Sequence, residues 1–164
     1  MSRLDRRTLL AALAGGLCAT PLRAAPAVPG EVVQWPPVRL LDGSPWGRAQ
    51  AEGKAVVAVI WSITCPFCKR HNAHLERLRQ AAAGRPLEIV TVARENDPQA
   101  VQQYMARQGW FFAVTLDQAP MRAALTMRNM APITVTVDRQ GRLKQVIPGE
   151  MFEEDVMDLL KLAG

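Results

Sequence analysis

The chain alternates short apolar runs with stretches in which apolar residues recur at helical spacing. Residues 56–61 form a continuous apolar run, which is typical of a strand buried on both faces of a sheet. The inward positions then recur at steps of three and four, which predicts a helix that ends near Gly84. These positions are Cys68, His71, Leu75, Leu78 and Ala82. Residues 87–93 are apolar again and predict a second core strand, parallel to the first through a right-handed crossover.

Capping and turn residues mark where the helices and strands of the second half of the chain begin and end. Asp97 and Pro98 predict the start of a helix, and Gly109 predicts its end. The remaining elements are a strand at 112–116, a helix from Pro120 to near Asn129, strands at 133–137 and 142–147 joined by a hairpin turn, and an amphipathic helix at 153–162.

A proline-rich lead-in at residues 28–37 precedes a predicted edge strand at 38–41 and a turn at Asp42-Gly43. Together the elements predict one α/β domain, residues 28–164, with a mixed sheet and helices on both of its faces. A domain of this length buries a core without disulfides or structural metals.

Residues 1–27 have the pattern of a cleaved export signal. The segment opens with basic residues and ends in a small-x-small site at 25–27. Its apolar run, residues 9–19, is shorter than the ~20 residues that a spanning helix needs. Arg6 and Arg7 favour a twin-arginine signal. A general secretory signal and an uncleaved membrane anchor remain alternatives.

Removal of this leader lowers the net charge. The whole chain has 20 Lys and Arg against 15 Asp and Glu; the leader holds four arginines and one aspartate, so 16 against 14 remain, a formal +2. The remaining basic residues are scattered, whereas a nucleic-acid-binding protein is expected to show a clustered basic face. We therefore expect no nucleic-acid partner.

Two cysteines carry the candidate chemistry. Cys18 lies in the leader, so only Cys65 and Cys68 remain, too few for a structural disulfide framework. They stand where a strand ends and a helix begins, and a helix N-terminus favours a thiolate. Pro66 suits the first turn. We expect Cys65 to attack and the more buried Cys68 to resolve the mixed disulfide; two inert core cysteines are the alternative.

Metal binding is a rival interpretation. Cys65, Cys68, His71 and His74 stand at a three-residue spacing that resembles a zinc ligand set. Each such step turns a helix by about 300°, so the four side chains do not converge. A c-type haem needs a histidine directly after the second cysteine, where this chain has Lys69. We expect no metal site and no cofactor. Copper delivery by the two thiols with His71, and an inert partner-binding module, remain alternatives.

Trp61, three further residues and Cys-x-x-Cys resemble the active site of the thioredoxin superfamily. The narrower resemblance is to the TlpA-like and ResA-like periplasmic thiol-disulfide oxidoreductases. Asp97-Pro98, the strand at 132–138 and the turn glycine after it extend the resemblance over residues 35–163. It implies a thioredoxin-like three-layer fold, with a helix–strand insert and an N-terminal edge strand.

The resemblance also implies site residues. The family's proline matching Pro132 is cis, lies opposite the two cysteines, and with the preceding residue, here Ala131, presents backbone groups to an extended substrate. A trans proline at a strand's first residue is the alternative. Trp61, Pro66 and Phe67 are expected to tune the cysteine pair.

Two carboxylates of the family are absent here. Val59 stands where thioredoxins proper carry a buried acid, and His71 stands where ResA-like proteins carry a glutamate. His71 lies one helical turn past Cys68 on the buried stripe. Two hypotheses therefore stay open: the ring accepts the Cys68 proton near neutral pH, or it fills the core.

The function that the resemblance implies is reduction of protein disulfides in the periplasm. Cys65 and Cys68 would supply the electrons, a membrane electron donor would restore them, and the protein would act as a monomer. A disulfide-donating oxidase would use the same residues. Apocytochrome c and a copper-site assembly protein are family-level candidates for the substrate.

Overall fold

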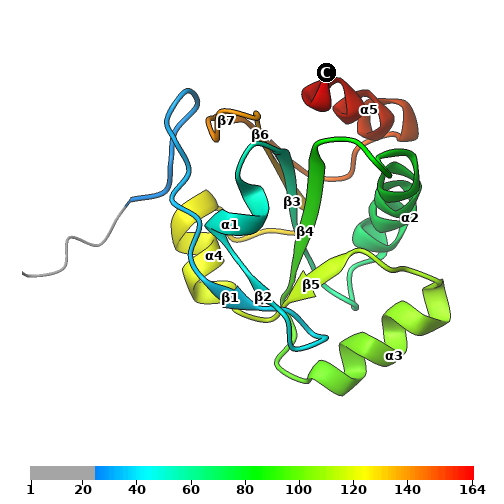
Figure 1. Ribbon diagram of the computed structural model, residues 1–164. Coiled ribbons are helices and arrows are strands. Elements are labelled where there is room, and N and C mark those ends of the chain that lie inside the picture. The colour runs from blue at the N-terminus through cyan, green and yellow to red at the C-terminus, as the bar shows by residue number, and fades with distance from the viewer. Residues whose placement is uncertain (1–24) are drawn as a thin grey trace, which may run out of the picture.

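The computed structural model describes residues 25–164. The predicted export leader therefore lies outside the described residues, except for residues 25–27. A five-stranded sheet runs through the centre of the molecule, and helices cover both of its faces (Figure 1). The predicted fold class, a mixed sheet between two helical layers, is confirmed.

The central sheet has the strand order β5-β4-β3-β6-β7. Its strands are β3 (Ala55–Trp61), β4 (Leu87–Ala93), β5 (Ala113–Thr115), β6 (Ile133–Val137) and β7 (Leu143–Pro148). Strands β3, β4 and β5 are parallel, whereas β6 is antiparallel to both β3 and β7. Every residue of β3 is buried, as the continuous apolar run predicts.

The helices divide between the two faces of this sheet. They are α1 (Arg48–Ala51), α2 (Pro66–Ala81), α3 (Pro98–Gln108), α4 (Gln118–Leu125), α5 (Glu153–Asp158) and the final 3₁₀-helix (Leu159–Ala163). In Figure 1, α2 and α5 lie side by side on one face, and α1 and α4 lie on the other. Helix α3 and strand β5 form the insert between β4 and α4.

Local capping explains the bounds of α3. The side chain of Asp97 accepts a hydrogen bond from Gln99 N, and Pro98 occupies the first turn, where its missing N–H is not needed. Gly109 ends the helix with φ 69°, in the left-handed region that glycine adopts without steric cost. These are the bounds that the sequence predicts.

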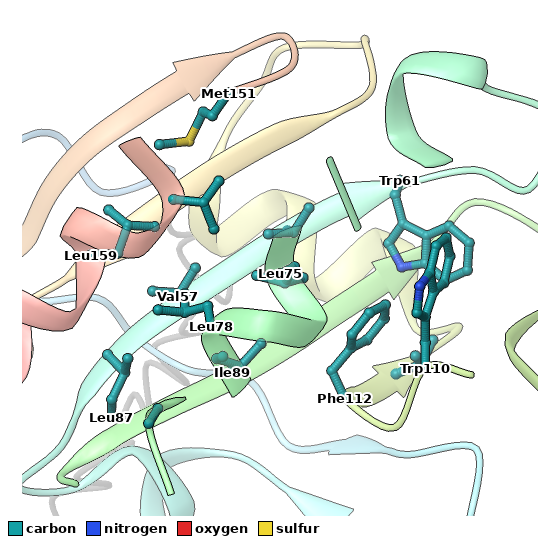
Figure 2. Packing of buried hydrophobic residues seen from close by; sticks show 14 of the residues in the cluster. Val57, Trp61, Leu75, Leu78, Leu87, Ile89, Trp110, Phe112, Met151 and Leu159 are labelled. Carbon is teal, nitrogen blue, oxygen red and sulfur yellow. The ribbon is translucent and has the colours of Figure 1, made fainter. Parts of the chain in front are cut away.

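The buried side chains form a cluster on each face of the sheet. Figure 2 shows the cluster on the α2 side, where the rings of Trp61, Trp110 and Phe112 gather beside Leu75. Trp61 packs edge-on against both Trp110 and Phe112. This aromatic group therefore joins the end of β3 to the segment that leads from the insert helix into β5.

A small N-terminal hairpin differs from the predicted single edge strand. β1 (Val38–Arg39) pairs with β2 (Pro45–Trp46) in a separate two-stranded sheet. Asp42 holds the turn, because its carboxylate accepts hydrogen bonds from the Ser44 N–H and hydroxyl. Leu41 N then donates to Val114 O, so the hairpin borders β5 at the edge of the central sheet.

Two helix bounds also differ from the predictions. Helix α4 begins at Gln118 rather than Pro120, because a proline inside the first turn removes no helical hydrogen bond. It ends at Leu125 rather than near Asn129, since Thr126 is extended and its hydroxyl accepts from Arg128 N. The last predicted helix changes to a 3₁₀-helix after Asp158. No helix within residues 25–164 has the length and apolar character of a membrane span.

Candidate active site

The two cysteines lie at the junction of β3 and α2. Cys65 is the N-cap residue of α2, and its Sγ accepts a hydrogen bond from Cys68 N at 3.1 Å. Pro66 occupies the first turn of the helix. Both cysteines are free thiols. One of the N–H groups that the first turn leaves unpaired, that of Cys68, therefore points toward the Cys65 sulfur.

The two thiols differ in exposure. Cys65 is partly exposed, whereas Cys68 is 0% exposed. Burial, followed by a hydrogen bond to the Cys65 sulfur, raises the pKa of Cys68 to about 12. Cys68 therefore stays protonated at neutral pH. The site thus presents an accessible sulfur with a buried, protonated sulfur behind it.

The pairing of β3 with β6 brings Ala131 and Pro132 close to the cysteines in space. Ile60, near the end of β3, pairs with Ile133 at the start of β6, so the residues before β6 meet those after β3. Cys65 Sγ lies 3.6 Å from Ala131 O. The Ala131–Pro132 peptide bond is cis. Pro132 O accepts a hydrogen bond from Gly149 N, so the carbonyl that faces the thiol is that of Ala131.

Trp61 and Phe67, which flank the cysteine pair in the sequence, differ in exposure. Trp61 is fully buried, and its Nε1 donates to Thr91 Oγ1 at 3.0 Å. Phe67 is 55% exposed, and the Arg70 guanidinium lies over its ring at 5.1 Å. Arg70 in turn forms two hydrogen bonds with the Glu150 carboxylate. Trp61 therefore supports the cysteine loop from within, while Phe67 extends its outer surface.

His71 is fully buried, and both of its ring nitrogens have partners. Nδ1 accepts a hydrogen bond from Met151 N at 3.2 Å, so the ring proton is on Nε2, which lies 3.0 Å from Thr134 Oγ1. Burial, followed by the nearby charge of His74, lowers the pKa of His71 to about 4. The neutral ring thus links α2 to β6 and to the segment before α5.

Glu95 is a candidate site residue that the sequence reasoning missed. It follows β4 by two residues, and its Oε1 accepts from Ser62 Oγ at 2.6 Å and Ile63 N at 3.0 Å. Its Oε2 is buried and has no hydrogen-bond partner within residues 25–164. The charge of Glu95 also contributes to the raised pKa of Cys68, after larger contributions from burial and Cys65.

A signal for Glu95 was present in the sequence. Parallel strands end at the same edge of a sheet, and Trp61 pairs with Ala93 at the ends of β3 and β4. A carboxylate just after the second core strand is therefore expected beside the cysteine loop that follows the first. The spacing of the cysteines alone does not reveal it.

The possible metal ligands do not gather in one place. Within the described part of the chain, no three His, Cys, Asp or Glu side chains form a group that could hold a metal ion. His71 points to Thr134 and Met151, while His74 lies 3.7 Å from Glu153 on α5.

The profile of the Redoxin family matches residues 33–162, which is most of the chain. The chain belongs to the Redoxin family. Thiol-disulfide oxidoreductase ResA of Halalkalibacterium halodurans is 28% identical over 123 residues, covering 74% of this chain and 69% of that protein. Soluble secreted antigen MPT53 of Mycobacterium tuberculosis is 35% identical over 68 residues, covering 41% of this chain and 38% of the antigen.

Solved structures show the same fold. A thiol:disulfide interchange protein of the thioredoxin family from Chlorobium tepidum superimposes with a TM-score of 0.75 at 23% identity, covering 85% of this chain and 99% of the other. A secreted Mycobacterium tuberculosis disulfide oxidoreductase gives 0.66 at 20% identity, covering 76% and 93%. The family and its named relatives place this chain among the ResA-like thiol-disulfide oxidoreductases of the thioredoxin superfamily.

Proposed function

We propose that this protein reduces disulfides of exported proteins, with Cys65 as the attacking thiol and Cys68 as the resolving thiol. One observation carries the assignment of roles. Cys65 is partly exposed at the helix N-cap and accepts the Cys68 N–H, whereas Cys68 is fully buried behind it. A substrate sulfur reaches Cys65 first, and Cys68 is then close enough to displace it.

The reaction transfers two electrons to the substrate. The Cys65 thiolate attacks one sulfur of a substrate disulfide, which forms a mixed disulfide and releases the other substrate sulfur as a thiolate. The Cys68 thiolate then attacks Cys65 Sγ, the Cys65–Cys68 disulfide forms, and the second substrate sulfur leaves as a thiolate. A membrane electron donor restores the dithiol by the same exchange in reverse.

Backbone recognition suits a catalyst of protein disulfides. The Ala131 carbonyl faces Cys65 at 3.6 Å, at the point where the chain enters β6. We assign Ala131 and Pro132 to the binding of an extended substrate segment, which would add main-chain hydrogen bonds beside the attacking sulfur. Phe67 offers such a segment an exposed apolar ring. Trp61 and Pro66 hold the cysteine loop and the helix start in place.

Glu95 is our candidate for the acceptor of the Cys68 proton. A thiol whose pKa is about 12 needs a base before it can resolve the mixed disulfide at neutral pH. Glu95 Oε1 is held by Ser62 and Ile63, and Oε2 is buried without a partner within residues 25–164. This carboxylate therefore supplies the function for which the sequence offered only His71, whose Nδ1 lone pair already accepts from Met151 N.

The reducing direction is supported by the state of Cys68. A group that stabilises the dithiol form raises the reduction potential, and a Cys68 that stays protonated contributes no thiolate stabilisation at neutral pH. The periplasmic location and the export signal rest on the sequence of residues 1–27 and on the likeness to relatives, one of which is named a secreted antigen. The site requires no second copy of the chain, which supports a monomer.

The direction is tested by the reduction potential of the Cys65–Cys68 pair, measured in equilibrium with glutathione. We expect a potential more negative than about −230 mV, the lower end of the glutaredoxin range, and a reduced pair in the intact cell. A potential near that of strong oxidants, about −120 mV, with an oxidised pair in the cell, would support the oxidase alternative instead.

A further inference from the structure

Asn72 is a buried amide for which the mechanism above has no use. It lies in the second turn of α2, and its side chain is 0% exposed. Within residues 25–164, neither its Oδ1 nor its Nδ2 has a hydrogen-bond partner. An amide buried in this way destabilises the fold, and an apolar side chain of similar size would not. The position therefore calls for a reason other than packing.

The helical geometry places this amide beside the resolving cysteine. Asn72 follows Cys68 by four residues, so the two lie on the same side of α2, one turn apart. Helical side chains lean toward the N-terminus and cover the preceding turn. The Asn72 amide is thus expected to lean toward the turn that carries Cys68. In this structure, where Cys68 is a thiol, the amide makes no hydrogen bond to the sulfur.

The neighbouring polar side chains of α2 already have hydrogen-bond partners. On one flank, both nitrogens of His71 bind Thr134 and Met151. On the other flank, which Asn72 shares, the Glu76 carboxylate accepts from Phe111 N and from Arg79. The cluster of buried side chains on the α2 side of the sheet is apolar and includes the aromatic group of Figure 2. Of the groups that the proposed reaction charges, the Cys68 sulfur is the one that lies one turn before Asn72 on the same side of the helix.

We propose that Asn72 is a positioning residue whose Nδ2–H donates a hydrogen bond to the Cys68 sulfur when that sulfur becomes a thiolate. This inference rests on the proposed resolving role of Cys68. A thiolate buried among apolar side chains is disfavoured, and a neutral donor reduces that penalty without adding a charge.

The chemical step is the second one of the reaction. Glu95 accepts the proton of Cys68, and the Cys68 electron pair attacks Cys65 Sγ. The Cys65–Cys68 bond forms, the bond between Cys65 and the substrate sulfur breaks, and the substrate leaves as a thiolate. Asn72 neither gives nor takes a proton; its N–H stabilises the charge on Cys68 before the attack.

The test uses 5,5′-dithiobis(2-nitrobenzoate) as a small disulfide, with the release of thionitrobenzoate followed by stopped flow in the reduced protein. The first equivalent reports the attack by Cys65, and the second reports resolution by Cys68. For Asn72→Leu we expect an unchanged first phase. The second phase should be about tenfold slower at neutral pH, with its pH profile shifted upward, because a hydrogen bond to a charged group is lost.

Thr136→Val is the matched control. Thr136 is also fully buried, and its Oγ1 has no partner within the described residues. Both substitutions remove an unpaired buried polar group, so neither should lower the unfolding midpoint, and only Asn72→Leu should slow the second phase. Asn72→Asp, which lacks the donor, should slow it at least as much.

An unchanged second phase and pH profile in Asn72→Leu would overturn the role of Asn72 and leave the roles of the cysteines intact. A faster second phase in Asn72→Asp would also overturn it, because a base rather than a donor would then be what the site needs. If the unsubstituted protein releases no first equivalent, the assignment of Cys65 fails, and this inference fails with it.

Discussion

Buried polar groups near the two sides of the active-site helix α2 differ in whether they have hydrogen-bond partners. On the β6 side, His71 is held by Thr134 and Met151, and each of its nitrogens has a partner. On the β4 side, one oxygen of Glu95 and both amide atoms of Asn72 have none within residues 25–164. Buried polar groups that are hydrogen-bonded stabilise the fold and fix its geometry. Buried polar groups without a partner destabilise it, so their presence needs a reason other than stability. The comparison gives His71 a structural role and leaves Glu95 and Asn72 as the candidates for chemistry. Thr136 on β6 is also unpaired within residues 25–164 and serves only as a control.

The substitution His71→Leu should lower the stability of the fold more than the other substitutions. His71→Leu leaves Met151 N and Thr134 Oγ1 buried without a partner. The free energy of unfolding should fall by about 3 kcal/mol, since each buried group left unpaired costs about 1–3 kcal/mol. Chemical denaturation measures this, with His74→Leu as the control. Unchanged stability, together with a shifted pH profile of disulfide resolution, would instead make His71 the proton acceptor.

The substitution Glu95→Gln should slow the resolution of mixed disulfides. Glu95→Gln keeps an oxygen that can accept from Ser62 and Ile63 but removes the basic carboxylate. Resolution of a mixed disulfide at pH 7 should slow by about a hundredfold, the lower end of what a positioned base contributes. Rapid-quench kinetics measures it, with Glu88→Gln at the far end of β4 as the control. A rate equal to that of the unsubstituted protein would exclude Glu95 as the base.

The buried His71 ring should also make the stability of the fold depend on pH. The pKa of His71 is about 4 in the folded protein, below its ordinary value of 6.5, because the ring is buried. The unfolded chain therefore binds the extra proton first, and stability that is complete above pH 6.5 is lost as the pH falls toward 4. The slope approaches about 1.4 kcal/mol per pH unit.

This slope should be absent in His71→Leu between pH 6 and pH 5, above the range in which the ion-paired glutamates protonate. Urea denaturation at a series of pH values gives the comparison. Parallel curves for the two proteins would show that the His71 ring is not held neutral by the fold.

The smallest expected change in stability comes from removing the exposed ion pair between Arg70 and Glu150. Arg70 binds the Glu150 carboxylate and covers Phe67, but its side chain is largely in solvent. Exposed ion pairs contribute little to stability because water and salt screen them. Arg70→Ala should change the thermal midpoint no more than Arg77→Ala does. A loss comparable to that of His71→Leu would mean that the surface network, not the buried ring, fastens α2.

The elements that the sequence predicts well are those with a strong local signal. Strands β3, β4 and β6 are buried along nearly their whole length, so their apolar runs mark their ends to within a residue. Asp97 and Gly109 bound α3 through capping chemistry. The cysteine pair was placed correctly because the change from strand to helix spacing falls on it.

The parts that sequence reasoning missed depend on tertiary contacts. Strand β2 has two residues and α1 has four, which is too short for any periodicity to appear. Glu95 looks like an ordinary polar loop residue until the pairing of β3 and β4 brings it to Ser62. The unpaired state of Asn72 cannot be read from a pattern, because the sequence does not show which groups its amide meets.

The trapping of mixed disulfides tests whether Cys65 is the attacking thiol and Cys68 the resolving thiol. The Cys68→Ala and Cys65→Ala proteins, each mixed with a peptide that contains one disulfide, are analysed by mass spectrometry without reductant. We predict a covalent peptide adduct on Cys65 in the Cys68→Ala protein and no adduct in the Cys65→Ala protein, whose remaining thiol is buried. Equal adducts on both proteins, or none on either, would contradict it.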